Sequence, residues 1–228
     1  MYTGEQCPAP GVPTTVILSG GLDSGVCLGL VVKNVGHPGA ITAVSFDYGQ
    51  AHSKELAYAG MLAGHYQVEH EIVKLDRVLL RGLAKESKPI KEPDLTQVNL
   101  LPKTWVPGRN LIMIAQAAAL AYANQEHLIV GGWHASDYPG YPDCRVWFLE
   151  CAERAVQEGM AYPVNLWAPL LHSTKRQIVK LGHEIDTPFR LTWSCYKGDS
   201  VPCGICDACV RRKDAFELNL LDDPALAK

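Results

Sequence analysis

Residues 14–24 read TTVILSGGLDS, and this stretch decides the fold. A β-branched, apolar run breaks at Ser19, Gly20 and Gly21, and an apolar run resumes at 25–32. Such a pattern predicts a strand, a glycine turn and the start of a helix. Backbone N–H groups of the turn and of the first helical turn converge there, and the positive end of the helix favours an anion. The stretch therefore predicts a binding site for a phosphate group.

The polar side chains of this stretch suit a nucleotide bound with a metal ion. Ser19 and Ser24 offer hydroxyl donors, whereas the Asp23 carboxylate is suited to hold a Mg²⁺ ion that bridges phosphate oxygens. A plain helix start, with Ser19 or Asp23 as its cap, is the alternative. The letters SGGLDS resemble the SGGxDS signature of the pyrophosphatase loop in ATP-dependent adenylating enzymes. We therefore expect ATP to contact Leu18, Ser19, Gly20, Gly21, Leu22, Asp23 and Ser24, together with Phe46 near the end of the next strand.

The composition favours a small-molecule substrate. Of 228 residues, 47% are hydrophobic and 20% are charged, as in ordinary soluble globular proteins. A net charge of −3 gives no electrostatic footprint for nucleic acid or an anionic membrane. No run approaches the roughly 18 apolar residues of a membrane-spanning helix, and residues 1–13 lack the basic start and apolar core of a signal peptide. We therefore expect a cytoplasmic protein without membrane contact. The oligomeric state is not readable, and a homodimer is left open.

Strand-like runs alternate with helical patterns along the chain. After the first strand, apolar runs occur at 40–46, 68–75, 127–131 and 164–168, and helical patterns lie at 53–64, 111–124, 145–157 and 176–181. This order predicts an α/β fold with a doubly wound parallel sheet. Ligands of such sheets bind at the carboxyl ends of the strands, so residues 19–24 and 47–50 should share one crevice.

Two segments interrupt or follow this alternation. Residues 77–107 are charged and rich in proline, which predicts a solvated loop that partly serves as a flap over the nucleotide site. We place an ATP-binding domain at 1–190 and a cysteine-rich C-terminal segment, packed on it, at 191–228. Asn110 is expected to cap the helix that begins at Leu111, and Asp143 is either a cap of the helix at 145–157 or a substrate contact.

Four of the eight cysteines crowd into fifteen residues near the C-terminus: Cys195, Cys203, Cys206 and Cys209. Four thiolates suit the closed tetrahedral site of a structural zinc ion. A disulfide is disfavoured in a reducing cytoplasm, whereas an iron–sulfur cluster is the main alternative, because CxxCxxC also suits one. None of the four is followed by proline in the ferredoxin manner, so zinc is favoured.

Several blocks together resemble the 7-cyano-7-deazaguanine synthase family over about residues 14–216. They are SGGLDS at 19–24, FDYGQ at 46–50, VPGRN at 106–110, GYPDCR at 140–145, LTWSCY at 191–196 and the cysteines after them. The resemblance implies a Rossmann-like fold of the adenine-nucleotide α-hydrolase type and a zinc ion on Cys195, Cys203, Cys206 and Cys209. It also implies the ATP-dependent conversion of 7-carboxy-7-deazaguanine and ammonia to 7-cyano-7-deazaguanine, a step toward queuosine-type nucleosides, through an adenylated carboxylate and an amide.

Individual residues suit parts of that reaction. Lys175 is a candidate cation for the phosphates, with a solvated surface lysine as the alternative. Arg109 could pair with the substrate carboxylate or with a phosphate, and a deazaguanine ring needs aromatic faces and carboxylate acceptors. Two histidines near the crevice, His134 and His172, are interpreted as structural. We expect catalytic roles for Asp23, Ser24, Arg109 and Lys175, and substrate contacts from Tyr48, Gln50, Asn110, Asp137, Tyr141 and Asp143.

Three other functions stay open at this point. A relative could stop at the amide, or pass the activated deazaguanine carbonyl to a protein amine. An RNA sulfurtransferase also adenylates with SGGxDS, but it needs a reactive cysteine in the cleft and a basic RNA surface, which the charge of −3 argues against. The third alternative is not an enzyme. It is an interaction module that is stabilised by zinc and whose loop binds a nucleotide as a regulator.

Overall fold

The computed structural model describes residues 9–48, 54–75, 106–134, 141–197 and 201–226. Within these residues, parallel strands form one sheet in the order β3-β2-β1-β4-β5. The strands are β1 (Thr14–Ile17), β2 (Ile41–Asp47), β3 (Glu69–Lys74), β4 (Leu128–Val130) and β5 (Asn165–Trp167). The helices are α1 (Leu22–Val35), α2 (Lys54–Tyr66), α3 (Arg109–Ala123), α4 (Val146–Met160), α5 (Lys175–Glu184) and α6 (Asp207–Glu217), with short 3₁₀ helices η1 (Pro38–Ala40), η4 (Pro142–Cys144) and η5 (Phe189–Leu191).

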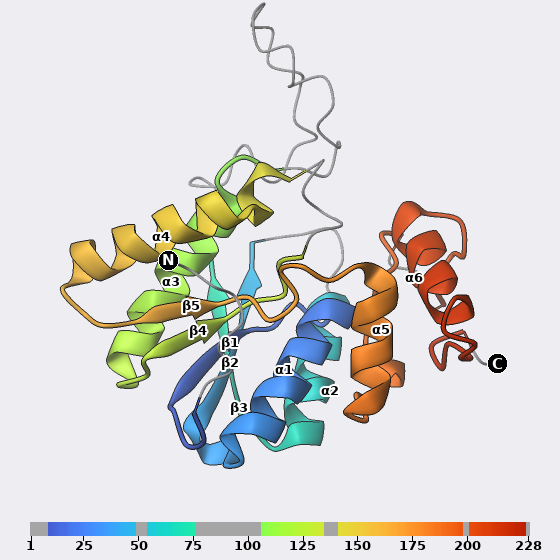
Figure 1. The fold of residues 1–228 in the computed structure, drawn as a ribbon, viewed down its shortest axis with the longest axis horizontal. Coiled ribbons are helices and arrows are strands. Elements are labelled where there is room, and N and C mark those ends of the chain that lie inside the picture. Colours follow the sequence, from blue (N-terminus) through green and yellow to red (C-terminus); the bar gives the residue numbers. More distant parts are fainter. Residues whose placement is uncertain (1–8, 49–53, 76–105, 135–140, 198–200, 227–228) are drawn as a thin grey trace, which may run out of the picture.

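The sheet is the middle of three layers, with α3 and α4 on one face and α1, α2 and α5 on the other (Figure 1). Along β2, Ile41 and Ala43 belong to the core beneath α1, whereas Val44 and Phe46 belong to the core beneath α3 and α4. Because successive residues of a strand point to opposite faces, a strand buried on both faces reads as one apolar run. The predicted doubly wound parallel sheet is confirmed.

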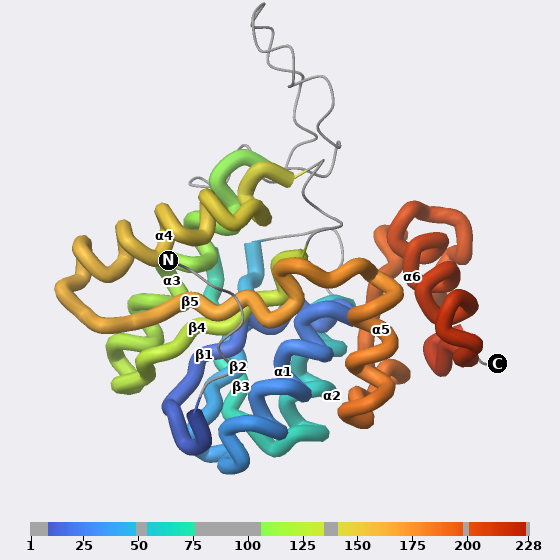
Figure 2. The backbone as a smooth tube through the Cα atoms, in the orientation of Figure 1, coloured from blue at the N-terminus to red at the C-terminus, as the bar shows by residue number. Residues whose placement is uncertain are grey.

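The order of the strands places a crevice between β1 and β4. Chain connections leave β1 toward one side of the sheet and β4 toward the other, and ligands of open α/β sheets bind at such a reversal. From β5 the chain runs to the start of α5 beside α1 (Figure 2). The loops after β1 and β4 and the start of α5 therefore meet at one end of the sheet.

Two predicted helix caps are wrong. Gly108, with a left-handed φ of 76°, is the N-cap of α3, so Asn110 already has helical geometry and cannot cap the first turn. Its side chain reaches across to η4 instead, where its amide donates to the main-chain oxygen of Asp143 at 3.1 Å. Asp143 lies within η4, and Arg145 is the N-cap of α4 without a side-chain cap. Both asparagine and aspartate are thus available for another role.

The C-terminal segment contains a helix that was not predicted from the sequence, α6. α6 begins directly after Cys206 and packs against α5. The predicted domain boundary at residue 190 stays a prediction, and most of the predicted flap at 77–107 lies outside the described residues. Among the described helices, none combines the length and the apolar character that a membrane crossing requires.

A buried glutamate at the far end of the sheet gives a prediction about pH. Glu126 accepts hydrogen bonds from the hydroxyls of Thr15 on β1 and Thr42 on β2, the latter at 2.6 Å. Burial raises the pKa of Glu126, and the two hydroxyl donors offset only part of that rise. Because the unfolded chain ionises at a lower pH than the folded one, this group favours the folded state fully below a pH of about 4.3 and progressively less as the pH rises through its folded pKa.

Glu126→Gln, which cannot ionise, is therefore expected to flatten the loss of stability between pH 5 and pH 8. Thermal unfolding measured across this range checks the expectation, with Glu184→Gln on the exposed face of α5 as the matched control. Parallel curves for the wild type and Glu126→Gln would show that Glu126 stays ionised in the fold.

Candidate functional site

The glycine turn after β1 is held by its own serines. The Ser24 hydroxyl donates to the oxygen of Gly21 at 3.1 Å and accepts from the N–H of Ser19 at 3.2 Å. The Ser19 hydroxyl lies 3.0 Å from that of Ser24 and accepts from the N–H of Gly21 at 3.2 Å. Gly21 is the N-cap of α1 without a side-chain cap, so neither Ser19 nor Asp23 caps the helix. The caps predicted under that alternative, Ser19 and Asp23, are therefore wrong.

Gly20 has a conformation that only glycine adopts easily. Its φ is +83°, and a Cβ atom there would lie 2.1 Å from the main-chain oxygen of Glu55 in α2. The backbones of the turn and of α2 are thus in direct contact. Leu18 and Leu22 on either side of the turn are buried in the core, so their main-chain atoms are what they offer to a ligand.

Asp23, in the first turn of α1, lies between groups from two distant segments. The ammonium of Lys175 donates to both carboxylate oxygens at 2.6 Å, and Nε2 of His134 lies 3.5 Å from one of them. Burial raises the pKa of Asp23, but the charge of Lys175 and the contact with His134 outweigh burial and hold the pKa well below its usual range. Asp23 is therefore ionised at neutral pH, as a ligand for a cation must be.

The position of Lys175 follows from the start of α5. Thr174 is the N-cap, and its hydroxyl and the Gln177 side chain form a capping box, which fixes the first turn that carries Lys175.

His134 follows β4, and Gly132 in the same loop is so close to α1 that an added Cβ would lie 3.2 Å from the N–H nitrogen of Ser24. A structural role was predicted for His134, and in the structure His134 contacts Asp23.

The second part of the crevice lies at the end of β2. Tyr48, Arg109 and Glu55 are half-buried and interact there. Burial raises the pKa of the Tyr48 hydroxyl, partly offset by the charge and hydrogen bond of Arg109, and burial likewise raises the pKa of Glu55 against the charge of Arg109. The structure thus brings the predicted Tyr48 and Arg109 together. Glu55 was not predicted, although it lies in the first turn of α2, a few residues after the FDYGQ block.

The third part is η4, in the block that contains Tyr141. Asp143 is only 7% exposed, and neither oxygen of its carboxylate has a hydrogen-bond partner among the described residues. The Asn110 amide holds the main chain of η4 through the oxygen of Asp143 and also lies 3.8 Å from the sulfur of Cys144. A buried carboxylate without partners is costly unless a ligand supplies the donors.

The other residues predicted to contact ATP or the substrate either pack against the core or lie outside the described residues. The Phe46 side chain is buried in the core under α3 and α4, at 5% exposure, so its predicted contact with ATP stays a prediction that concerns main-chain atoms. Tyr141 is half-buried against the same core. Gln50 and Asp137 lie outside the described residues.

The four clustered cysteines converge as expected for a metal site. The sulfurs of Cys195, Cys203, Cys206 and Cys209 all lie within 4.8 Å of one another, and those of Cys203 and Cys209 are 4.0 Å apart. Sulfurs bound at about 2.3 Å to a tetrahedral zinc ion would be about 3.8 Å apart. N–H groups of Lys197 and Cys203 point at the sulfur of Cys195, at 3.4 and 3.3 Å. This donor set fits a metal ion.

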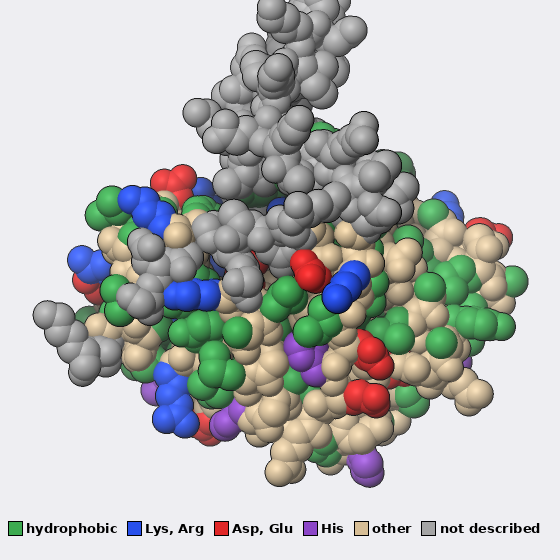
Figure 3. Space-filling model, turned by 180° about the vertical axis from the view of Figure 1, so that it is seen from behind, with side chains coloured by type: hydrophobic (Ala, Val, Ile, Leu, Met, Phe, Trp, Pro, Cys, Tyr) green, Lys and Arg blue, Asp and Glu red, His purple; other side chains and the backbone are tan. Residues whose placement is uncertain are grey.

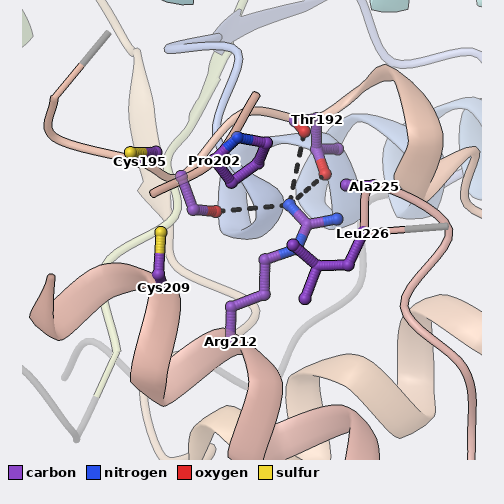
Figure 4. Close-up of a pocket in the computed structure, with 8 residues that line it drawn as sticks. Thr192, Cys195, Pro202, Cys209, Arg212, Ala225 and Leu226 are labelled. Atoms are coloured by element: carbon purple, nitrogen blue, oxygen red, sulfur yellow. Dashed lines mark hydrogen bonds between the residues drawn. The ribbon is translucent and has the colours of Figure 1, made fainter. Parts of the chain in front are cut away.

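Arg212 of α6 fixes the segment that leads into the first cysteine. Its guanidinium donates to the oxygen and hydroxyl of Thr192 at 3.3 and 2.8 Å, to Ser194 at 3.3 Å and to the oxygen of Phe189 at 3.1 Å. It also forms a two-point ion pair with Asp223, at 2.7 and 2.9 Å. Figure 4 shows the bonds from Arg212 to Thr192 beside a cavity that Thr192, Cys195, Cys209 and Arg212 help to line. With a volume of about 10 Å³, the cavity has room for one water molecule and not for a substrate.

The comparison with known families agrees with this geometry. The family described as "Queuosine biosynthesis protein QueC" matches residues 14–220. The chain belongs to this family. A QueC-family relative from Prochlorococcus marinus (strain MIT 9301), named 7-cyano-7-deazaguanine synthase, is 43% identical over 209 residues, which is 89% of this chain and 92% of that protein. A protein of the same name from Methanothermobacter thermautotrophicus is 38% identical over 216 residues, 91% of this chain and 96% of that protein.

Similarity to solved structures concerns the fold. The U34-tRNA thiolase NcsA from Methanococcus maripaludis, with its [4Fe-4S] cluster, is 13% identical at a TM-score of 0.52, covering 92% of this chain and 66% of that protein. A glutamine-dependent NAD⁺ synthetase from Acinetobacter baumannii, in complex with ADP, is 15% identical at a TM-score of 0.52, covering 86% of this chain and 33% of that protein. The predicted family and enzyme class are confirmed by the curated relatives, which do not favour the alternatives.

Proposed function

We propose that this QueC-family chain makes 7-cyano-7-deazaguanine from 7-carboxy-7-deazaguanine, ammonia and ATP. The observation that carries the proposal is the Asp23 carboxylate, held at the start of α1 by Lys175 and His134 beside the glycine turn. Relatives that span nearly the whole chain are named for this product. On the face drawn in Figure 3, described Lys and Arg side chains are interspersed with acidic ones, which suits a small substrate better than a nucleic acid.

The reaction needs two activations. An oxygen of the substrate carboxylate attacks the α-phosphorus of ATP, and the bond to pyrophosphate breaks. Ammonia then attacks the carbonyl carbon, and AMP leaves with the carboxylate oxygen, which gives the amide. The amide oxygen attacks the α-phosphorus of a second ATP, and a second pyrophosphate leaves. Loss of AMP with two protons from nitrogen then gives the nitrile. The N–H groups of the glycine turn and the ammonium of Lys175 stabilise the charge on the phosphates.

Asp23 is the residue that would hold Mg²⁺, which would supply Lewis-acid stabilisation of the phosphate charge. Arg109 pairs with the substrate carboxylate or with a phosphate. Asp143 accepts the ring N–H and amino donors of the deazaguanine, and Tyr48 and Tyr141 offer aromatic faces to the ring. Gln50 and Asp137 complete the proposed substrate contacts, and Asn110 acts beside Asp143.

The product of the reaction tests the proposal. Incubation with 7-carboxy-7-deazaguanine, excess ATP and ammonium is expected to give a base with the mass of the nitrile, and phosphorus NMR should show AMP and pyrophosphate. Detection of ADP and orthophosphate instead would show that the carboxylate is activated as an acyl phosphate and not by adenylation. Exclusive accumulation of the amide, or a base bound to a polypeptide, would overturn the assignment in favour of the amide-stopping or conjugating reaction.

We propose that the four cysteines hold a structural zinc ion. Four thiolates close the coordination shell and leave no position for a substrate. Burial raises the pKa of the Cys209 thiol to about 12, so a bound cation is what makes this thiol a thiolate at neutral pH. We therefore expect about one zinc and no iron per chain in elemental analysis of the purified protein.

Cys206→Ser is expected to destabilise the fold, because it removes one of the four ligands. A loss of about 2 kcal/mol would lower the unfolding temperature by roughly 4–8 °C. Cys151→Ser, at an exposed thiol of α4, is the control and should melt like the wild type. Iron with a visible charge-transfer absorption, or a metal-free protein with an unchanged melting temperature, would contradict the zinc site.

The remaining proposals concern the setting of the enzyme. Free ammonia is the nitrogen donor, the protein works in the cytoplasm, and a homodimer is a prediction that light scattering of the purified protein tests.

A further inference from the structure

The segment between η5 and the first cysteine contacts the glycine turn directly. The main-chain N–H of Trp193 donates to the oxygen of Gly20 at 2.9 Å. One residue earlier, the Thr192 methyl group is so close to α1 that a Cβ added at Gly25 would lie 3.0 Å from it. The cysteine-rich end of the chain and the turn at residues 19–24 are therefore in contact, although more than 150 positions separate them in the sequence.

The bond from Trp193 determines the direction of an N–H group in the turn. A trans peptide unit is planar, so its C=O and its N–H point to opposite sides. Since the oxygen of Gly20 points at Trp193, the N–H of Gly21 in the same peptide points away from it. The N–H of Gly21 indeed donates to the hydroxyl of the exposed Ser19, at 3.2 Å. Contact between Gly20 and the backbone of α2 keeps this peptide from turning.

The side chain of Trp193 faces the other way, toward the cysteines. It is 3% exposed and packs in one cluster with Cys195 and Cys209. Its indole N–H donates to the oxygen of Cys195 at 2.9 Å, and the ring of Tyr58 in α2 lies 5.3 Å away, centre to centre. Arg212, one turn after Cys209, holds both ends of the same segment through Phe189, Thr192 and Ser194.

We propose that Trp193 is a positioning residue that joins the four-cysteine site to the phosphate-binding turn. Its main-chain N–H fixes the orientation of the peptide between Gly20 and Gly21, so that the N–H of Gly21 stays on the side of the Ser19 hydroxyl. Its indole fixes that bond to the loop of Cys195. Ordering of the four thiols around a metal ion thereby orders the turn. The inference rests on the proposed function in taking ATP as the ligand of the turn, and on no other part of it.

Nucleotide binding, measured without turnover, tests the inference. The probe is an ATP analogue with a methylene group between the α- and β-phosphates, titrated with Mg²⁺ in a calorimeter. Trp193→Ala is expected to raise its Kd about tenfold, the usual effect of one misplaced donor to a charged group. Hydrogen exchange in peptides covering 18–24 should become faster. Leu149→Ala, which removes a fully buried side chain from α4 across the sheet, is the control for lost stability and should leave this Kd unchanged.

Two further measurements complete the test, one on metal-stripped protein and one on a second variant of Trp193. Wild-type protein stripped of metal by a chelator should show the same rise in Kd and the same faster exchange at 18–24. If Trp193→Ala does not fold, Trp193→Phe, which keeps an aromatic ring but loses the indole bond to Cys195, should bind the analogue about threefold more weakly at unchanged metal content. A wild-type Kd in the folded Trp193 variant or in the stripped protein overturns the inference. Wild-type protein that binds the analogue but makes no nitrile contradicts the proposed function alone, and one that binds no nucleotide overturns both.

Discussion

Asp23→Asn is expected to lower ATP consumption by at least about 10²–10³-fold while the protein stays folded. The variant keeps the size of the side chain but removes the charge that would hold Mg²⁺ and that pairs with Lys175 at 2.6 Å. The Asp23 side chain is 25% exposed, and it lies outside the hydrophobic clusters, so its loss opens no cavity in the core. AMP release in the presence of 7-carboxy-7-deazaguanine and ammonium, beside a melting curve, measures both parts of the expectation.

Two controls separate the causes of this loss. Asp214→Asn neutralises an exposed carboxylate on α6 and should keep full activity. In the double variant Asp23→Asn with Lys175→Met, activity should stay as low as in Asp23→Asn. Recovery in the double variant would show that the uncompensated ammonium, and not the missing carboxylate, caused the defect. Full turnover by Asp23→Asn would remove Asp23 from the reaction altogether.

The predictable parts of the site are those whose residues lie close together in the sequence. The glycine turn was readable because an apolar run, two glycines and a second apolar run follow one another within twenty residues. The four cysteines were readable because a metal site of four thiols uses short spacings. The alternation of strands and helices fixed the sheet, and with it the crevice at the carboxyl ends of the strands.

What the sequence left open depends on contacts between distant segments. Lys175 was predicted as a cation for the phosphates, but it lies 152 positions from Asp23, so its own neighbourhood could not distinguish it from a solvated lysine. The contact of His134 with Asp23 arises from the approach of the β4 loop to α1, which the spacing of residues does not encode. The predicted cap of α3 was wrong for a local reason. Gly108, in a left-handed conformation, is the N-cap, two positions before the predicted Asn110.

Asp143 is where binding and stability are expected to oppose each other. The carboxylate is 7% exposed, and no described residue donates to it, while the Asn110 amide fixes the main chain that carries it. Holding a buried carboxylate without donors destabilises the free protein. The arrangement makes sense if the N–H and amino groups of the deazaguanine supply the donors on binding. The free protein is then less stable than it could be, in exchange for a preformed acceptor.

Asp143→Asn is therefore expected to raise the KM for 7-carboxy-7-deazaguanine by about 10- to 100-fold, since hydrogen bonds to a charged acceptor are lost. The same variant should stabilise the free protein by about 1 kcal/mol, because a neutral amide is less costly to bury, which corresponds to an unfolding temperature about 2–4 °C higher. The KM for ATP should stay close to that of the wild type, because Asp143 lies on η4 and not on the glycine turn. Steady-state kinetics in each substrate and melting curves without ligand measure the three quantities. A less stable variant with an unchanged KM for the deazapurine would show instead that the carboxylate has a structural partner. If the carboxylate serves the ligand, removal of its charge stabilises the free protein and weakens binding of the deazapurine at the same time.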